Sequence, residues 1–149
     1  STEHGPRHGD EINIILEDKN YGWPVASFGT DYVSKKWPLD ETNSTHSNYE
    51  MPIMSFGNKI GISNLIVYED SYFDRWKNNL IVSTLASKSV IRLVYNKEKK
   101  SLIYIENIPI NERIRDIVKL DDGKIALLTD RGSTPDEIAK IIILELKDK

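Results

Sequence analysis

Residues 113–129 read RIRDIVKLDDGKIALLT, and this stretch decides the fold class. Two short apolar runs flank Asp122 and Gly123. An Asp-Gly pair between such runs is a strong hairpin signal, because glycine accepts the positive φ of tight turns. The stretch therefore predicts two antiparallel strands joined at residues 120–124. The charged residues 95–100 predict a second hairpin turn of the same kind.

The rest of the chain repeats this pattern of short apolar runs separated by turn residues. The runs predict strands at residues 11–17, 53–57, 63–69, 79–85, 89–95, 101–108, 113–120, 124–129 and 139–146. Only residues 72–78, with Phe73 and Trp76 three apart, predict a short helical turn, and residues 30–52 form a long polar loop. The fold class is all-β, either a β-sandwich or part of a β-propeller, and composition does not choose between them.

Length and composition limit the classes of function. The chain has 149 residues, which predicts a single domain over residues 1–149. A net charge of -3 provides no positive field for a phosphate backbone, so nucleic acid is not an expected partner. The absence of cysteine excludes disulfides, thiolate metal sites and cysteine nucleophiles. No apolar run is long enough to insert into a membrane, no signal peptide is recognisable, and the missing initiator Met suggests a fragment.

Residues 3–11, EHGPRHGDE, form the first candidate site. Two glycines and a proline impose an irregular backbone that presents carbonyl oxygens, which are ligands that calcium prefers, with Asp10 or Glu11 nearby. His4 and His8 have the spacing of a helical zinc pair, but the glycines and the proline prevent a helix. The alternative is a surface turn with solvated side chains, and the residues alone leave both interpretations open.

Arg113 and Arg115 form the second candidate site. Side chains alternate along a strand, so these two guanidinium groups share a face and Ile114 points to the other. Paired guanidinium forks suit a ligand with several carboxylate or carbonyl oxygens. The alternative is a surface pair whose charge is balanced by Glu112 and Asp116.

Residues 20–24, NYGWP, place two aromatic side chains around a glycine. Such a pair can stack on a flat ligand or on a sugar. A packed corner at the end of a strand is the commoner use of this pattern, and we adopt that structural interpretation.

Four motifs taken in order, at residues 3–13, 20–24, 113–116 and 122–130, resemble the glucose/sorbosone dehydrogenase family, the soluble quinoprotein sugar dehydrogenases. The motifs read EHGPRHGDEIN, NYGWP, RIRD and DGKIALLTD. Members of that family fold as six-bladed β-propellers more than twice as long as this chain. The resemblance therefore implies that the chain is the C-terminal part of such a propeller.

The resemblance also implies a cofactor site. Family members hold pyrroloquinoline quinone and calcium and oxidise aldoses to lactones. The carbonyl groups that hold calcium match Gly5 and Pro6, and the side chains of His4 and Asp10 match positions that line the quinone and the metal. Arg113 and Arg115 match the arginine pair that binds the cofactor.

The histidine that acts as the catalytic base in this family comes from a blade before the Gly-Pro loop, and His4, His8 and His46 do not match it. The chain is therefore expected to contain no catalytic residue and to be inactive in isolation. The resemblance implies a periplasmic or extracellular location. A chain cut from a propeller ring also exposes apolar blade surfaces, which predicts a homo-oligomer of the isolated chain.

Residues 56–63 depart from the family pattern at the loop that faces the quinone. This departure leaves Lys59 as a candidate contact for a carboxylate of the cofactor, with a solvated loop lysine as the alternative. The same departure supports a second hypothesis for the whole chain. In that hypothesis, the chain is a non-catalytic propeller module that binds a sugar or a protein partner.

Overall fold

The computed structural model describes residues 1–29, 46–131 and 138–147. The described residues contain strands and two single-turn 3₁₀ helices, so the prediction of an all-β chain is confirmed. The chain divides into two compact units, Ser1–Ile62 and Ser63–Lys149. None of the described helices has the length and apolarity needed to cross a membrane.

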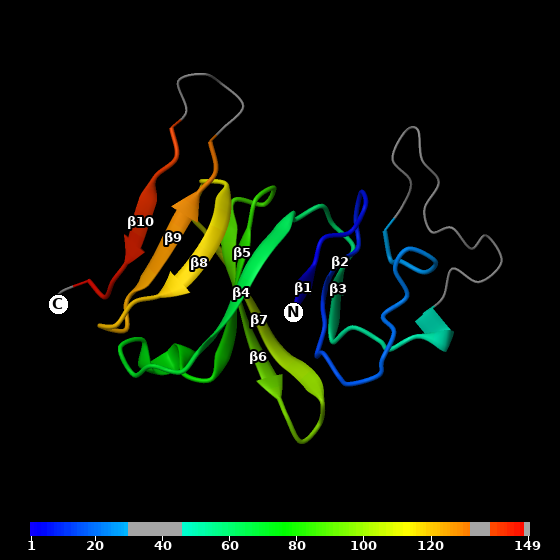
Figure 1. Cartoon of the computed structure of the whole chain (residues 1–149). Coiled ribbons are helices and arrows are strands. Elements are labelled where there is room, and N and C mark those ends of the chain that lie inside the picture. The colour runs from blue at the N-terminus through cyan, green and yellow to red at the C-terminus, as the bar shows by residue number, and fades with distance from the viewer. Residues whose placement is uncertain (30–45, 132–137, 148–149) are drawn as a thin grey trace. The chain divides into compact units, whose positions relative to one another are not determined.

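The first unit is built around a small sheet in the order β1-β2-β3 (Figure 1). Its strands are β1 (Thr2–Glu3), β2 (Asp10–Ile12) and β3 (Met54–Phe56), paired antiparallel. The 3₁₀ helix η1 (His46–Asn48) precedes β3. All three residues of β2 are buried, so this central strand carries the interior of the unit.

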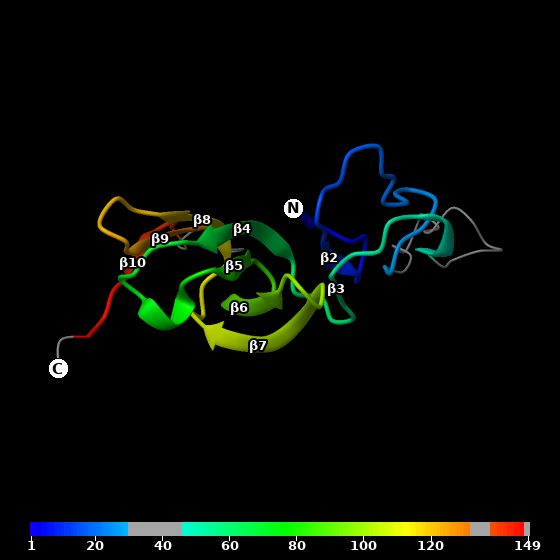
Figure 2. The ribbon, with the colours of Figure 1, turned by 90° about the horizontal axis from the view of Figure 1, so that it is seen from below.

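The second unit contains a four-stranded and a three-stranded sheet, and Figure 2 shows β4 and β5 between β6 and β7 on one side and the three-stranded sheet on the other. The first sheet has the order β4-β5-β6-β7. Its strands are β4 (Ile62–Tyr68, whose first residue closes the first unit), β5 (Asn79–Thr84), β6 (Ser89–Asn96) and β7 (Ser101–Pro109). The 3₁₀ helix η2 (Asp74–Trp76) lies between β4 and β5, within the predicted helical turn.

The three-stranded sheet has the order β10-β9-β8 and contains the predicted hairpin of residues 113–129. Its strands are β8 (Ile114–Lys119), β9 (Ile125–Thr129) and β10 (Ile141–Leu144), all antiparallel. The predicted turn at residues 120–124 is confirmed. Gly123 has φ +82°, and the Leu120 amide donates a hydrogen bond to the Lys124 carbonyl at 2.8 Å.

The core of the second unit lies between the two sheets. The side chains of Tyr68, Ile81, Ile114 and Leu127 come from four different strands and are all fully buried in one cluster. The Tyr68 hydroxyl donates to the Gly123 carbonyl at 2.6 Å and accepts from the Phe73 amide at 3.1 Å. Burial of the ring and these two bonds together join β4, the chain before η2 and the β8–β9 turn.

The strand predicted at residues 11–17 is wrong beyond Ile12. β2 ends there, and Ile14, Ile15 and Leu16 are exposed. The Tyr21 hydroxyl accepts from the Leu16 amide at 2.8 Å and donates to the Ile14 carbonyl at 2.7 Å, so a side chain takes the place of a neighbouring strand. The sequence analysis also did not predict β1, because a strand of two residues is too short to show an alternation of apolar and polar side chains. Most of the predicted loop at residues 30–52 lies outside the described residues.

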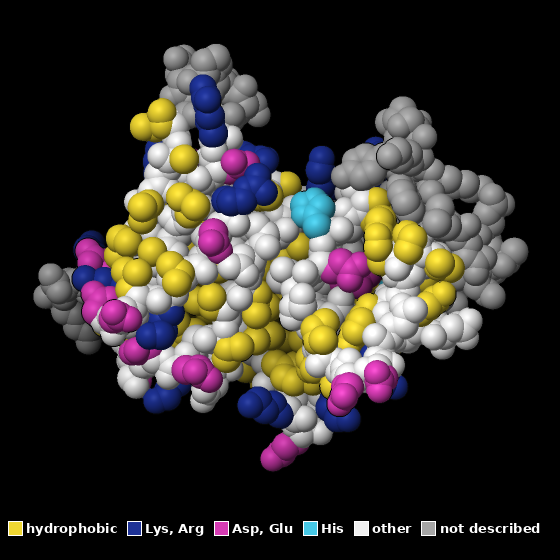
Figure 3. Space-filling model, viewed as in Figure 1, with side chains coloured by type: hydrophobic (Ala, Val, Ile, Leu, Met, Phe, Trp, Pro, Cys, Tyr) yellow, Lys and Arg dark blue, Asp and Glu magenta, His cyan; other side chains and the backbone are white. Residues whose placement is uncertain are grey.

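Large apolar side chains remain exposed on both sheets of the second unit. They lie on β7 and on the three-stranded sheet, where Figure 3 shows hydrophobic side chains gathered over β8, β9 and β10. The exposed residues of these four strands are Ile103, Tyr104, Ile105, Val118, Leu128, Ile141 and Ile143, and Val67 of β4 is also exposed.

Candidate functional site

The Gly-Pro loop of the first unit is organised by the carboxylate of Asp10. This side chain is buried, and its two oxygens accept hydrogen bonds from the amides of Gly5 at 2.9 Å and Ile62 at 3.1 Å. The His4 Nδ1 donates to the Ile62 carbonyl at 3.1 Å. Asp10 therefore joins the loop to the end of the unit, and His4 lies beside the same junction.

Neighbouring atoms come so close to the glycines in and around this loop that they leave no room for a Cβ atom. A Cβ atom on Gly5 would lie 2.0 Å from the His8 carbonyl oxygen. One on Gly9, which has φ +72°, would lie 2.3 Å from the Gly29 nitrogen, and one on Gly29 would lie 2.4 Å from the Pro6 ring. Backbone atoms cannot give way as a flexible side chain can, so the loop is packed tightly against residues 28–29.

The carbonyl groups of Gly5 and Pro6 are available as ligands. Both residues are buried, and neither carbonyl oxygen accepts a hydrogen bond from the described part of the chain. Residues 4–9 form neither helix nor strand, which confirms that His4 and His8 cannot act as a helical zinc pair. Lys59 is exposed and makes no hydrogen bond or ion pair with the described residues, so its role stays a prediction.

Arg113 and Arg115 converge on one carboxylate in the second unit. Asp130 Oδ2 accepts from Arg115 Nη2 at 2.7 Å and from Arg113 Nη2 at 3.3 Å, while the Ile114 side chain between them is fully buried. The prediction that the two guanidinium groups share a face is confirmed. These bonds hold the pKa of Asp130 below its ordinary value, with Arg115 the larger cause.

The alternative interpretation, in which Glu112 and Asp116 balance the charge of the arginine pair, is wrong. Glu112 pairs with Lys140, and the Asp116 carboxylate accepts from the Asn64 amide. A single Asp130 carboxylate faces two guanidinium groups, so this cluster keeps a net positive charge and further N–H donors, which suits an anionic ligand.

A β-bulge at Arg115 sets this geometry. Ile114 pairs with Thr129 and Asp116 with Leu128, so Arg115 is an extra residue in β8. In a regular strand, Ile114 and Ile117 would point to opposite faces because they are three residues apart. The bulge restores both isoleucines to the core and leaves Arg115 outside it, 54% exposed.

The first unit also buries an ionisable pair that sequence reasoning did not identify. Glu11 and His46 are each 3% exposed, and the His46 Nε2 lies 3.6 Å from the Glu11 Oε1. The Phe28 ring stacks on the imidazole with centroids 4.1 Å apart. The two residues lie 35 positions apart in the sequence (46 minus 11), and no local pattern connects them.

The packed corner predicted for residues 20–24 is only partly present, because the Trp23 side chain is 47% exposed. The Tyr21 hydroxyl bonds the preceding backbone, Gly22 has φ +98°, and the amides of Val25 and Ala26 donate to the Gly22 carbonyl. The segment therefore reverses the chain after β2.

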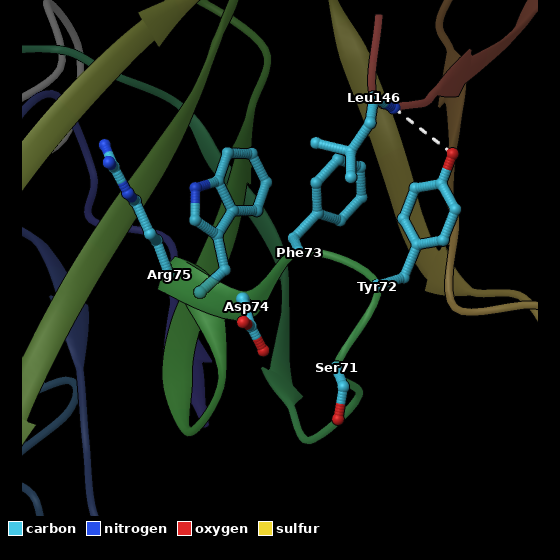
Figure 4. A pocket seen from close by; sticks show the side chains of 7 residues that line it. Ser71, Tyr72, Phe73, Asp74, Arg75 and Leu146 are labelled. Carbon is cyan, nitrogen blue, oxygen red and sulfur yellow. Dashed lines mark hydrogen bonds between the residues drawn. The ribbon is translucent and has the colours of Figure 1, made fainter. Parts of the chain in front are cut away.

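A pocket in the second unit lies beside η2 and was not predicted. Figure 4 shows the rings of Tyr72 and Phe73 lining it, with the Leu146 amide donating to the Tyr72 hydroxyl at 3.2 Å. The Phe73 ring packs edge-on against Tyr72 and stacks on Trp76, with centroids 5.0 and 4.9 Å apart. The aromatic side chains mainly contact one another, which suits a structural role.

Comparison with known proteins identifies close relatives over nearly the whole chain. The family described as Glucose / Sorbosone dehydrogenase matches residues 1–140. The aldose sugar dehydrogenase YliI of Escherichia coli K12 is 34% identical over 132 residues, which are 89% of this chain and 35% of that protein.

Solved structures agree with this relationship. A glucose dehydrogenase crystal structure has a TM-score of 0.83 at 32% identity, covering 98% of this chain and 40% of the solved one. The apo-form of the soluble aldose sugar dehydrogenase from Escherichia coli has a TM-score of 0.75 at 32% identity, covering 87% and 37% of the two chains. The chain thus spans about two-fifths or less of the length of these proteins.

Proposed function

This chain belongs to the glucose/sorbosone dehydrogenase family, and we propose that it supplies the C-terminal blades of a six-bladed β-propeller that oxidises aldose sugars to lactones. The proposed cofactors are pyrroloquinoline quinone and calcium. The proposed location is periplasmic or extracellular, as for the family.

The observation that carries this proposal is the convergence of Arg113 and Arg115 beside Asp130. Two guanidinium groups held by one carboxylate are already oriented, so little side-chain entropy is lost when an anion binds. Their excess positive charge and unused N–H groups match a ligand that carries several carboxylates and quinone oxygens.

The Gly-Pro loop fits calcium by the chemistry of its donors. The carbonyl oxygens of Gly5 and Pro6 have no donor among the described residues, and hard cations take such oxygens as ligands. Asp10 would hold the loop in place through the hydrogen bond that its carboxylate accepts from the Gly5 amide, and His4 bonds the nearby Ile62 carbonyl. When bound, the calcium-quinone pair would supply an acceptor for hydride from the sugar.

The proton acceptor for the sugar hydroxyl is proposed to come from another part of the complete protein. Within this chain, His46 is buried under Phe28 and cannot reach a substrate. The isolated chain is therefore proposed to be inactive. Its exposed apolar residues on β7 and β10 support the further proposal that the isolated chain self-associates.

The test is calorimetric titration of pyrroloquinoline quinone, with calcium, into the complete protein that carries this chain. Loss of a hydrogen bond to a charged group costs about 1.5–3 kcal/mol, so Arg113→Ala or Arg115→Ala should weaken binding about ten-fold or more. Arg75→Ala, which replaces an exposed arginine within η2 of the same unit, is the matched control and should bind as the natural protein does.

A dye-coupled assay of sugar oxidation on the same samples distinguishes a sugar dehydrogenase from a non-catalytic propeller module. Quinone binding together with sugar oxidation supports the dehydrogenase proposal. Absence of quinone binding by the complete natural protein would overturn it and favour a propeller module that binds a sugar or a protein partner. The altered loop at residues 56–63 is the observation that favours this second function.

A further inference from the structure

The start of β8, which lies between the two arginines of the candidate site, is held by a side chain of the four-stranded sheet. Ser63 is the second residue of β4, and its hydroxyl oxygen lies 2.7 Å from the Ile114 carbonyl oxygen. That carbonyl belongs to the peptide group that joins Ile114 to Arg115. Because Arg115 is the extra residue of the bulge, this bond acts at the point where the regular pairing of β8 with β9 is interrupted.

The hydrogen bonds around Ser63 have one consistent direction. Two oxygen atoms 2.7 Å apart require a proton between them, and a carbonyl has none, so the Ser63 hydroxyl donates to Ile114. The Ser83 hydroxyl, 2.9 Å from that of Ser63, is therefore the donor in the contact between the two serines. Ser83 accepts in turn from the Asn64 amide at 3.1 Å. Three hydrogen bonds thus run in series and end at the Ile114 carbonyl.

Ser83 anchors this series in the interior of the second unit. Its side chain is fully buried on β5, the strand next to β4. Hydrogen bonds in series polarise one another, and they are stronger away from water than at the surface. The Ser63 hydroxyl is therefore held toward Ile114 by a buried partner, although Ser63 itself is only half-buried.

A second contact holds the other side of the bulge. The Asn64 side-chain amide donates to Asp116 Oδ1, which also accepts from the Ile117 amide at 2.8 Å. The residues on both sides of Arg115 are thus bonded to two consecutive residues of β4. The Arg115 side chain is 54% exposed, and a long exposed side chain has many rotamers, so a fixed backbone limits where its guanidinium group can lie.

We propose that Ser63 is a positioning residue of the arginine site: through the Ile114 carbonyl, its hydroxyl fixes the direction in which Arg115 leaves β8 toward Asp130 and an anionic ligand. The only hydroxyl proton of Ser63 is donated to the backbone, so Ser63 acts through Arg115 and not as a donor to the ligand. The identity of the ligand as the quinone rests on the proposed function, whereas the effect of Ser63 on Arg115 and Asp130 does not.

The first experiment measures the pKa of Asp130 in the complete protein by carbon-13 NMR of the aspartate carboxyl groups, with Asp130→Asn used for assignment. The hydrogen bond from Arg115 is the largest cause that holds this pKa below 3.8. Ser63→Ala removes the hydroxyl, so Arg115 should lose its orientation and the pKa of Asp130 should rise toward 3.8. Ser63→Thr keeps a hydroxyl group and should restore the value of the natural protein.

Tyr68→Phe is the matched control, because it removes a hydroxyl from the last residue of the same strand, where the bonds go to Gly123 and Phe73. It should destabilise the unit and leave the pKa of Asp130 unchanged. If Ser63→Ala does not fold, Ser63→Cys takes its place, because a thiol is a weaker donor than a hydroxyl. An unchanged pKa of Asp130 in the Ser63 variant, or an equal rise in Tyr68→Phe, would overturn the proposal.

The second experiment asks whether Ser63 affects quinone binding through Arg115. Replacing a residue that orients a binding group typically costs on the order of ten-fold in affinity, and calorimetric titration of Ser63→Ala should show a loss of that size. In the Arg115→Ala background, the same substitution should have no further effect. An equal loss in both backgrounds would refute the positioning role. If the natural protein does not bind quinone, the proposed function fails alone, because the NMR measurement needs no cofactor.

Discussion

Replacement of Tyr68 by phenylalanine should destabilise the second unit more than the loss of one oxygen suggests. The hydroxyl is fully buried and serves two backbone groups, the Gly123 carbonyl at 2.6 Å and the Phe73 amide at 3.1 Å. Phenylalanine keeps the ring, so the packing with Phe73 is retained and the change isolates the polar contribution.

The expected cost follows from the two groups left behind. Both Gly123 and Phe73 are buried, so water cannot replace the hydroxyl without rearrangement of the core. An unsatisfied buried group costs about 1–3 kcal/mol, and two such groups predict a loss of about 2–4 kcal/mol in the free energy of unfolding.

Urea denaturation of the complete protein, followed by intrinsic fluorescence, measures this loss. With a slope of about 1–3 kcal/mol per molar urea, the midpoint of the transition that reports this unit should fall by about 1 M or more. Tyr95→Phe is the control, since the described residues offer the Tyr95 hydroxyl no hydrogen bond and its removal should change stability by less than about 0.5 kcal/mol. Equal midpoints for Tyr68→Phe and Tyr95→Phe would refute the assignment of Tyr68 as the link between β4 and the β8–β9 turn.

Two further predictions concern the candidate sites. Gly9→Ala should lower the thermal midpoint of the first unit, because its φ of +72° is unfavourable for alanine and the added Cβ would lie 2.3 Å from the Gly29 nitrogen. Gly57→Ala, whose Cβ would meet nothing within 4 Å, should have little effect, and a similar loss in both would contradict the close packing of the loop. Asp130→Asn should destabilise the second unit at neutral pH, because the lowered pKa of Asp130 means that its stabilisation is present above 3.8 and disappears as the pH falls below that value. Thermal midpoints of the two proteins should therefore converge as the pH drops below 3.8, and a constant difference would show that the charge of Asp130 is not what stabilises the arginine pair.

Local sequence patterns were sufficient to predict most strands of the second unit. The apolar runs at residues 79–85, 89–95, 101–108 and 124–129 each contain or nearly coincide with an observed strand, because strand pairing there is between neighbours in sequence. The prediction failed at residues 13–17, where a tyrosine hydroxyl rather than a partner strand binds the backbone.

The candidate sites were predictable only in part. Residue types identified the Gly-Pro loop and the shared face of Arg113 and Arg115. They did not identify Asp130 as the counter-charge, because that carboxylate comes from the end of β9 and not from the strand of the arginines. The Glu11–His46 pair was missed for the same physical reason, since its members are close in space but 35 positions apart in the sequence.

The bulge in β8 serves the arginine pair rather than the core. Ile114 and Ile117 are three positions apart and still reach the same interior, because one residue between them is unpaired. Deleting Arg115 would leave the two isoleucines two positions apart on one face of a regular strand, so both would stay buried. The deletion would instead remove the guanidinium group that lies 2.7 Å from Asp130.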